Sequence, residues 1–348
     1  MRGQFSDQGR MFSYLSPEER VPKGHPLRAV RAMVRTVLEE LHGDFARLYS
    51  SDGRPSIPPE QLLSALLLQV FYGIRSERQL MEQLDYNLLY PWVPTTFTKN
   101  RERLQKGDIF QRFMSVLLNH PKVKPLLSDE HFSVDGTLIE AWASHRSFQP
   151  KDGSGGDGTD FHKQRRSNDT HASVTDPESR LYKKARGKES KLCYMGHALM
   201  ENRNGLAVGG TVTHATGTAE REASEAMLAA RVKQTGKPAT VGEDKAYDAA
   251  DHGAALRKLK VTPHVARNDT LTKTGKRRTS IVSDAVAASA GYGMSQTRRK
   301  LIECVFGWGK QHGTLRKTNH RGLAHVASDF LLNIIAYNLI RIPKLITA

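Results

Sequence analysis

The sequence predicts an α/β protein preceded by a helical region. Apolar residues recur at helical spacing through most of the first 120 residues. Between about residues 131 and 266, short strand-like runs alternate with helical segments, a pattern that indicates an α/β sheet with parallel pairing. The Pro-containing segment 120–125 separates the two patterns. We therefore expect two domains, over residues 1–125 and 126–348.

The first region is expected to be helical from about Pro26 onward. A helix that is apolar nearly all round should follow Pro58–Pro59. Ser76 and Gln79 have the spacing of a capping box, which predicts another helix running to about residue 90. A further helix is expected over residues 108–119. Two helices joined by a short turn could read DNA as a helix-turn-helix, but the pattern alone favours an ordinary helical hairpin.

The second region contains two acidic residues in strand-like settings. Asp135 lies within an apolar run, where a carboxylate is costly without a partner or a function. A hairpin is expected to turn at Asn202–Gly205, and a helix over 218–235 precedes a strand that ends at Asp244. The remaining expected elements are a helix over 246–260, a strand over 261–266 and a C-terminal core helix over about 324–345.

A third acidic residue lies on a predicted helix over residues 297–312. Arg299, Glu303 and Lys310 share its polar stripe, and the other face is apolar. On this helix alone, the simplest interpretation of Glu303 is a surface ion pair with Arg299, which would stabilise the fold by less than about 1 kcal/mol.

Two segments, 150–191 and 267–280, are rich in Gly, Lys and Arg, and we expect basic flexible loops there. They are either solvated surface loops or loops that become ordered on phosphates, and the sequence favours neither. His162 and His171 lie in the first segment without further metal ligands in register, so we expect them to be solvated or to face DNA.

The chain is strongly basic, with 52 Lys and Arg, 36 Asp and Glu, a net charge of +16 and a pI near 9.8. Between Arg257 and Arg321 there are 15 basic and three acidic residues, a net of +12. This excess predicts a nucleic-acid partner. Charge alone does not separate an enzyme from an architectural protein.

The two cysteines, Cys193 and Cys304, form neither a disulfide framework nor a four-ligand zinc site. Their small number favours a reducing cytoplasm. The N-terminal residues lack the apolar core of a signal peptide, and the longest apolar runs are shorter than the ~20 residues that span a bilayer. We therefore expect a soluble cytoplasmic protein.

Asp135, Asp244 and Glu303 together supply the oxygen ligands that hard divalent cations prefer. Two such ions about 3.5–4 Å apart can stabilise both the attacking and the leaving oxygen at a phosphate. The basic residues expected to contact flanking DNA phosphates are Lys245, Arg298, Arg299, Lys310, Arg316 and Lys317.

Three segments resemble the signature blocks of bacterial insertion-sequence DDE transposases. They are VDGTLIEAW, EDKAYD and RRKLIECVFGWGKQHGTLRKTNHRG, which contain Asp135, Asp244 and Glu303 respectively. The acidic residues are 109 and 59 residues apart, as that family's spacing allows. Segments on both sides, including SYLSPEERVPKGHPLRAVR and AYNLIRIPKL, also resemble the family, so the likeness covers nearly the whole chain.

The resemblance implies a ribonuclease-H-like catalytic domain with Asp135, Asp244 and Glu303 as its triad. It implies two Mg²⁺ ions, with Mn²⁺ as a substitute, and cut-and-paste DNA transposition by end cleavage and strand transfer. The helical N-terminal domain would bind the terminal inverted repeats, and a homodimer would join two ends on nucleoid DNA. A β-rich insertion is expected between Asp244 and Glu303 or just before that interval.

The chain departs from the family pattern at two places. The third block of many members reads Tyr-x₂-Arg-x₃-Glu-x₆-Lys, but Gln296 stands at the Tyr position and Tyr292 comes four residues too early. The join at residues 90–95 is also shorter than usual. These departures leave an alternative, a catalytically decayed transposase that acts only as a sequence-specific DNA-binding protein. A nuclease without strand transfer is a closer alternative, since it would use the same triad.

Overall fold

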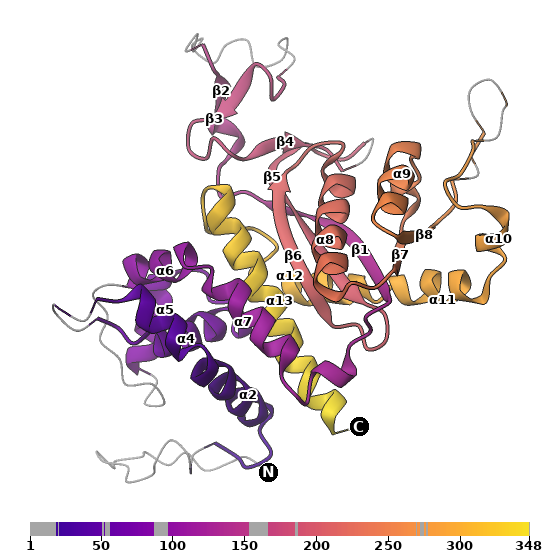
Figure 1. Ribbon diagram of the computed structural model, residues 1–348. Coiled ribbons are helices and arrows are strands. Elements are labelled where there is room, and N and C mark those ends of the chain that lie inside the picture. Colours follow the sequence, from indigo (N-terminus) through magenta and orange to yellow (C-terminus); the bar gives the residue numbers. More distant parts are fainter. Residues whose placement is uncertain are drawn as a thin grey trace, which may run out of the picture.

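The computed structural model describes residues 19, 21–50, 52, 56–86, 97–152, 166–184, 187–268, 270–271, 275 and 278–347. The helices of the N-terminal region form one part of the molecule. A mixed sheet with helices on both faces forms the other part (Figure 1). The long C-terminal helix α13 (Leu323–Ile346) passes between them.

Within the described residues, only helices and a short 3-10 turn precede the first strand. They are α2 (Pro26–Glu40), α3 (His42–Leu48), α4 (Pro59–Phe71), α5 (Glu77–Tyr86), α6 (Phe97–Lys106), α7 (Ile109–Asn119) and η1 (Lys124–Leu126). The predicted N-cap is confirmed, because the Gln79 backbone N–H donates to Ser76 Oγ at 3.0 Å. The predicted continuation of that helix beyond Tyr86 lies outside the described residues.

The N-terminal helices do not have a core of their own. One hydrophobic cluster joins Leu66 of α4 and Phe113 of α7 to Ile335 of α13, and continues into the sheet through Met200. Segment 120–125 therefore separates two patterns of secondary structure but not two cores. An independently folded helical domain over residues 1–125 stays a prediction.

The main sheet has six strands among the described residues, in the order β4-β5-β1-β7-β8, with β6 also paired to β5. The strands are β1 (His131–Glu140), β4 (Arg180–Tyr182), β5 (Lys191–Glu201), β6 (Ala207–His214), β7 (Ala239–Glu243) and β8 (Val261–Val265). β1, β7 and β8 run parallel to one another, as predicted, whereas β5 is antiparallel to β1. The predicted β5–β6 hairpin is also confirmed.

Alternate residues of β1 face different layers of helices. Phe132 and Val134 pack with Leu228 of α8 (Ala219–Thr235) and Leu256 of α9 (Ala250–Lys258). Ile139 instead belongs to the cluster that contains residues of α12 (Ile302–Gln311) and α13. This two-residue period follows from strand geometry. One face of the sheet is therefore covered by α8 and α9, and the other by α11 (Ala290–Arg299), α12 and α13.

The helix predicted over residues 297–312 is interrupted, so that prediction is wrong in its continuity. The helices in this part are α10 (Asp284–Ala287), α11 (Ala290–Arg299) and α12 (Ile302–Gln311), with the break at Lys300 and Leu301. The two pieces have different partners. Ser295 of α11 hydrogen-bonds to His264 of β8 at 2.8 Å, whereas Val305 of α12 packs in the cluster with α13.

The basic segment 150–191 contains short strands in its described part. β2 (Phe148–Pro150) pairs with β3 (His171–Ser173), and β4 joins the main sheet. His171 is buried and stacks on Phe148 with ring centroids 5.5 Å apart, so the prediction that it is solvated or faces DNA is wrong. His162 lies outside the described residues. Between Asp244 and Glu303, the described residues include no named strand except β8, so a β-rich insertion there is not seen.

α13 is long and apolar enough, by length and composition, to cross a membrane. In the fold, 67% of its most apolar window is buried. It packs against α2, α4 and α7 on one side and β6 on the other. Asn338 is buried on this helix and exchanges two hydrogen bonds with the Ala207 backbone of β6, at 3.0 and 2.7 Å. Packing on both sides accounts for the apolar composition that the sequence interpretation assigned to a core helix.

The buried His197 of β5 should make stability depend on pH. Burial lowers its pKa to about 4, from an ordinary value near 6.5, and its Nδ1 atom has no partner among the described residues. The unfolded chain therefore binds the proton first. His197 should contribute its full stabilisation above pH 6.5 and lose about 3 kcal/mol as the pH falls from 6.5 to 4.

Urea denaturation of wild type and His197→Gln between pH 4 and 7 measures this contribution. We expect the variant to lack the corresponding part of the pH dependence. The exposed His145 provides the control, since His145→Gln should follow the wild-type profile. Identical profiles for wild type and His197→Gln would contradict the assignment.

Candidate active site

Asp135 and Asp244 lie side by side at the same level of two neighbouring strands. The register of the parallel β1–β7 pair matches Ser133 with Gly242. Asp135 and Asp244 each follow two residues later, at the point where β7 ends. The structure therefore brings together two of the three predicted carboxylates, and they interact electrostatically.

The environment of Asp135 favours its protonated form. Its pKa is raised to about 6, with burial as the largest cause and the charge of Asp244 as a further one. A 2.7 Å hydrogen bond from the Gly136 backbone N–H and the charges of Arg299 and Lys184 act in the opposite direction. A cation brought to this carboxylate would relieve the repulsion between the two acids.

Glu303 stands apart from this pair. It lies in the first turn of α12, just after the break at Lys300 and Leu301. Its side chain is exposed. Arg299 is closer to the pair, since its charge acts on Asp135. Among the described residues, no three His, Cys, Asp or Glu side chains lie close enough together to hold one metal ion.

A different glutamate, Glu220, interacts electrostatically with the Asp135–Asp244 pair, and the sequence interpretation did not identify it. Glu220 lies in the first turn of α8, and its side chain covers Gly136 of β1. Burial raises its pKa most, and the charges of Asp135 and Asp244 raise it further. Acidic residues are common in the first turn of a helix, where they interact favourably with the helix dipole, so this position of Glu220 is not a specific signal of function.

Basic side chains lie beside these carboxylates. The pKa of Lys310 is lowered by burial and by the charges of Lys184 and Arg316, so these three cations lie near one another. Lys184 also acts on Asp135 and Glu220, which joins the basic group to the acidic one. Lys184 lies in the basic segment that was expected to be a flexible loop.

The remaining predicted bases are placed on the surface near these groups. Lys245 directly follows Asp244, and Arg298 lies in the last turn of α11; both are exposed. Lys317 is paired with Glu140 at 3.5 Å. The backbone around Lys317 pairs with the end of β1, since the Thr318 N–H donates to the Glu140 carbonyl at 2.9 Å. This pairing holds Arg316 beside β1.

Residues 127–339 match the family described as Transposase DDE domain, and residues 15–105 match the family described as Transposase domain (DUF772). The first match covers more than half of the chain. The chain belongs to the DDE transposase family. This family indicates a nucleic-acid phosphoryl-transfer enzyme.

Comparison with solved structures adds only remote likenesses to other transposases. A piggyBac transposase synaptic complex with hairpin DNA is 9% identical, with a TM-score of 0.41 over 90% of this chain and 74% of that one. A Mos1 transposase paired-end complex with the left transposon end is 17% identical, with a TM-score of 0.22 over 84% and 90% of the two chains. At these TM-scores neither likeness supports a conclusion about this chain. No curated protein matches its sequence.

In this DDE transposase, Gln296 serves as an anchor between α11 and β8. Its amide donates to the backbone carbonyl of His264. Tyr292, one turn earlier, donates to the carbonyl of Val265 at 3.1 Å. The residue that departs from the family pattern therefore has a defined structural contact. α11 remains attached to the parallel strand next to β7.

A buried hydrogen-bond network joins α8 and α9 to Glu243, the last residue of β7, which immediately precedes Asp244. His252 of α9 lies 2.9 Å from Glu243 Oε2 through Nε2, and 2.7 Å from Glu225 Oε1 through Nδ1. Ser224 of α8 donates to the other oxygen of Glu243. Burial lowers the pKa of His252, but hydrogen bonds and charges from Glu243 and Glu225 outweigh it, so the pKa is raised overall.

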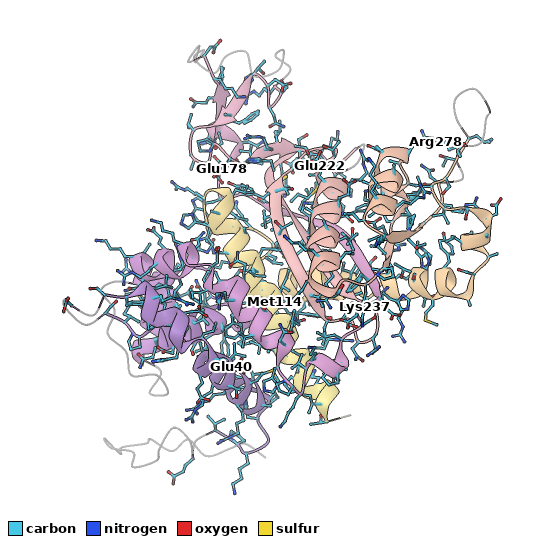
Figure 2. The ribbon with its side chains drawn as sticks, in the orientation of Figure 1. Glu40, Met114, Glu178, Glu222, Lys237 and Arg278 are labelled. Atoms are coloured by element: carbon cyan, nitrogen blue, oxygen red, sulfur yellow. The ribbon has the colours of Figure 1, made fainter. Side chains whose placement is uncertain are left out.

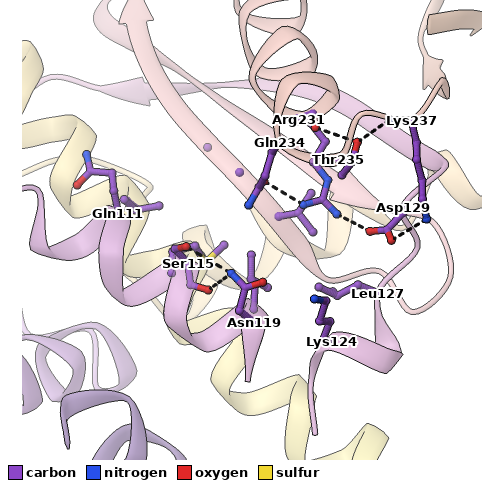
Figure 3. Close-up of a pocket in the computed structure, with 16 residues that line it drawn as sticks. Gln111, Ser115, Asn119, Lys124, Leu127, Asp129, Arg231, Gln234, Thr235 and Lys237 are labelled. Atoms are coloured by element: carbon purple, nitrogen blue, oxygen red, sulfur yellow. Dashed lines mark hydrogen bonds and ion pairs between the residues drawn. The ribbon is translucent and has the colours of Figure 1, made fainter. Parts of the chain in front are cut away.

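A cavity of about 450 Å³ in the transposase lies away from these groups. Residues from α7, β6, α8 and α13 line it, including Gln111, Gly210 and Gln234. Figure 3 shows the ion pairs at its rim, where Asp129 meets Arg231 at 2.9 Å and Lys237 at 3.5 Å. None of the three predicted carboxylates lines this cavity.

Removing His252 should destabilise the fold strongly. His252→Leu leaves the fully buried Glu243 without its cationic partner, which typically costs about 3–5 kcal/mol. Because the pKa of His252 is raised, the loss should be largest below pH 6.5 and should shrink as the pH rises through that raised pKa.

The free energy of unfolding in urea, measured at pH 6 and pH 9, tests this expectation. Adding Glu243→Gln to His252→Leu removes the unpaired charge and should restore part of the stability. A loss below about 1 kcal/mol at pH 6 for the single variant would show that the network does not stabilise the fold.

Proposed function

We propose that the chain is a Mg²⁺-dependent transposase that moves an insertion sequence by cutting its DNA ends and joining them to target DNA. Asp135, Asp244 and Glu303 form its catalytic triad in a ribonuclease-H-like domain. The observation that carries the proposal is the adjacent placement of Asp135 and Asp244 at the ends of parallel strands, within a DDE transposase domain.

The residues at this site fit a divalent cation in their chemistry. Both aspartates offer carboxylate oxygens, the ligands that Mg²⁺ and Mn²⁺ prefer, and their mutual repulsion favours an added positive charge. When bound, two such ions supply charge neutralisation at the scissile phosphate. The proposal assigns the third carboxylate to Glu303, from the first turn of α12.

The basic residues then orient the DNA backbone toward the carboxylates. Arg316 and Lys310 lie near Lys184, whose charge acts on Asp135, so a phosphate held by these bases would lie beside the acids. Lys245, Arg298, Arg299 and Lys317 complete the proposed contact surface. We assign recognition of the terminal inverted repeats to the N-terminal helices. We further propose that a homodimer brings two element ends together, and that it acts on nucleoid DNA in the cytoplasm.

Neutral substitution of each triad residue should abolish chemistry and preserve DNA binding. We expect Asp135→Asn, Asp244→Asn and Glu303→Gln each to slow Mg²⁺-dependent cleavage of an element end by about 100-fold or more. The exposed Asp251 of α9 provides a matched control, because Asp251→Asn should retain cleavage.

The assay uses DNA fragments that carry the terminal repeat, with cleavage resolved on denaturing gels and binding measured separately. Pre-cleaved ends with a plasmid target report strand transfer. Wild-type cleavage by Glu303→Gln would remove Glu303 from the triad. Binding without any cleavage by the wild-type chain would instead indicate a protein that only binds DNA.

DNA affinity should depend on Arg316 and Lys310. Alanine at either position should weaken binding and reduce the dependence of log affinity on log salt by about one. Lys317→Ala should have a smaller effect, because Lys317 is already paired with Glu140. Fluorescence anisotropy at several salt concentrations measures both quantities.

Lys237→Ala is the control for that experiment. Lys237 lies at the rim of the distant cavity and pairs with Asp129 (Figure 3). Its removal should leave the salt dependence unchanged. A larger change for Lys237→Ala than for Arg316→Ala would place the DNA near this cavity instead of beside Arg316.

A further inference from the structure

The end of α12 and the turn after it contain two glycines, in the segment GWGKQHGTL. A Cβ atom at Gly309 would overlap Leu315 Cδ1, and one at Gly313 would overlap Asn333 Oδ1 of α13. Each glycine thus leaves the space that a neighbouring side chain fills. The Leu315 N–H also donates to the Gly309 carbonyl at 3.0 Å, which closes the turn.

Thr314, inside this turn, is held by two side chains of α13. Its backbone N–H donates to Asn333 Oδ1 at 3.0 Å, and the Asn333 amide donates to Thr314 Oγ1 at 2.7 Å. The Thr314 hydroxyl donates in turn to Asp329, whose two carboxyl oxygens lie 2.9 and 3.0 Å away. Asn333 and Asp329 are buried and lie one turn apart. Thr314 therefore joins the turn to the long core helix through both its backbone and its side chain.

The helix that holds Thr314 is itself fixed at its N-terminal end. Glu178 lies at that end of α13 (Figure 2), and its Oε2 accepts the Leu323 N–H at 2.9 Å. The Gly322 N–H donates to Asp176 Oδ1 at 3.1 Å. Carboxylates at a helix N-terminus interact favourably with the helix dipole. Because α13 is also packed on both sides, it forms a rigid support for the turn.

The residues that follow this threonine alternate between the core and the surface. Leu315 and Thr318 are 1% and 0% exposed. Arg316 and Lys317 lie between them and are exposed. The Glu140 N–H of β1 donates to the Arg316 carbonyl at 3.4 Å, and the Thr318 N–H donates to the Glu140 carbonyl at 2.9 Å. The backbone of Arg316 is thus held on both sides, by α13 before it and by β1 after it.

Hydrogen bonds at Thr314 do more than apolar packing would. Leu315 already packs the turn into the core, so the turn has apolar anchorage without them. Hydrogen bonds depend steeply on distance and angle, and therefore fix the direction of the backbone as well as its position. An arginine that binds a phosphate loses conformational freedom, and this loss is smaller when its backbone is already fixed.

We propose that Thr314 is a positioning residue that directs Arg316 toward a phosphate of the DNA backbone. It does so through its hydrogen bonds to Asn333 and Asp329 of α13. The inference rests on the proposed function, because it assumes that Arg316 contacts DNA. It gives α13 a second role, since this core helix also orders a segment that contacts DNA. Thr314 acts through Arg316 and needs no DNA contact of its own.

Removal of the Thr314 hydroxyl without loss of volume tests the inference. Thr314→Val removes the hydrogen bonds of the hydroxyl, whereas Thr314→Ser keeps a hydroxyl that can form them. We expect Thr314→Val to bind a duplex that carries the terminal repeat about tenfold more weakly. Its dependence of log affinity on log salt should fall by about one, as for Arg316→Ala. Thr314→Ser should bind within about twofold of wild type.

Ser328→Ala provides a matched control on α13. The Ser328 hydroxyl donates to the Ala324 carbonyl of the same helix at 3.0 Å, so its loss should leave both DNA affinity and its salt dependence unchanged. Thermal melting without DNA verifies that each variant is folded.

A double-mutant cycle separates positioning from an independent effect on DNA binding. In an Arg316→Ala background, Thr314→Val should cause no further loss of affinity, because the side chain that Thr314 positions is absent. Additive losses would show that Thr314 acts without Arg316, and would overturn the proposal.

Arg316→Ala alone separates this inference from the proposed function. If Arg316→Ala weakens binding while Thr314→Val matches wild type, Thr314 does not position Arg316 and the proposed DNA surface stands. If neither variant changes the affinity, the proposed contact at Arg316 is wrong and the inference is wrong with it.

Gly313→Ala provides a second route that leaves the Thr314 side chain intact. The added methyl group would overlap Asn333 Oδ1 and lie 2.9 Å from the Gly309 carbonyl oxygen, so the turn must shift. We expect faster amide hydrogen exchange in residues 313–319, together with a loss of affinity similar to that of Thr314→Val. Faster exchange with wild-type affinity would overturn the proposal. Weaker binding with unchanged exchange would also overturn it, since affinity would then be lost without movement of the segment.

Discussion

Parallel pairing of β1 with β7 is the interaction on which the proposed site depends. The register that joins Ser133 to Gly242 places Asp135 and Asp244 beside each other, although they are 109 residues apart in sequence. A register shift of one residue would turn one of the two side chains to the other face of the sheet. The buried contacts of Phe132 and Val134 with α8 and α9 oppose such a shift. The same packing that stabilises the sheet therefore fixes the two carboxylates.

The segments after β8 connect this site to the N-terminal helices. α12 carries Glu303 and packs beside α13, which shares its core with α4 and α7. The chain beyond α12 pairs with the end of β1 at Glu140, and its Asn319 side chain donates to the Arg75 backbone carbonyl just before α5. The helices proposed to recognise an element end are thus in direct contact with the segment that follows Glu303. This continuity explains why one core spans both family matches.

Sequence patterns predicted most elements of the sheet correctly, because these depend on local periodicity and strand ends, and the same patterns placed Asp135 within a strand and Asp244 at the end of one. Asp135 and Asp244 stood out as carboxylates in or after apolar strands. The break at Lys300 and the burial of His171 were not predictable, since each depends on which partner a segment packs against. Glu220 was missed for the same reason. Its first-turn position resembles that of Glu222, and only the absence of a side chain at Gly136 distinguishes the two in space.

The most direct test of a cation centre between β1 and β7 is metal-directed cleavage of the polypeptide. Fe²⁺ bound in place of Mg²⁺ generates hydroxyl radicals that cut the nearest backbone in the presence of ascorbate and peroxide, and mass spectrometry locates the cuts. We expect cuts next to Asp135 and Asp244 that excess Mg²⁺ suppresses, with further cuts near any third carboxylate that contributes. Cuts confined to other parts of the chain, or cuts insensitive to Mg²⁺, would contradict a metal centre at these strand ends.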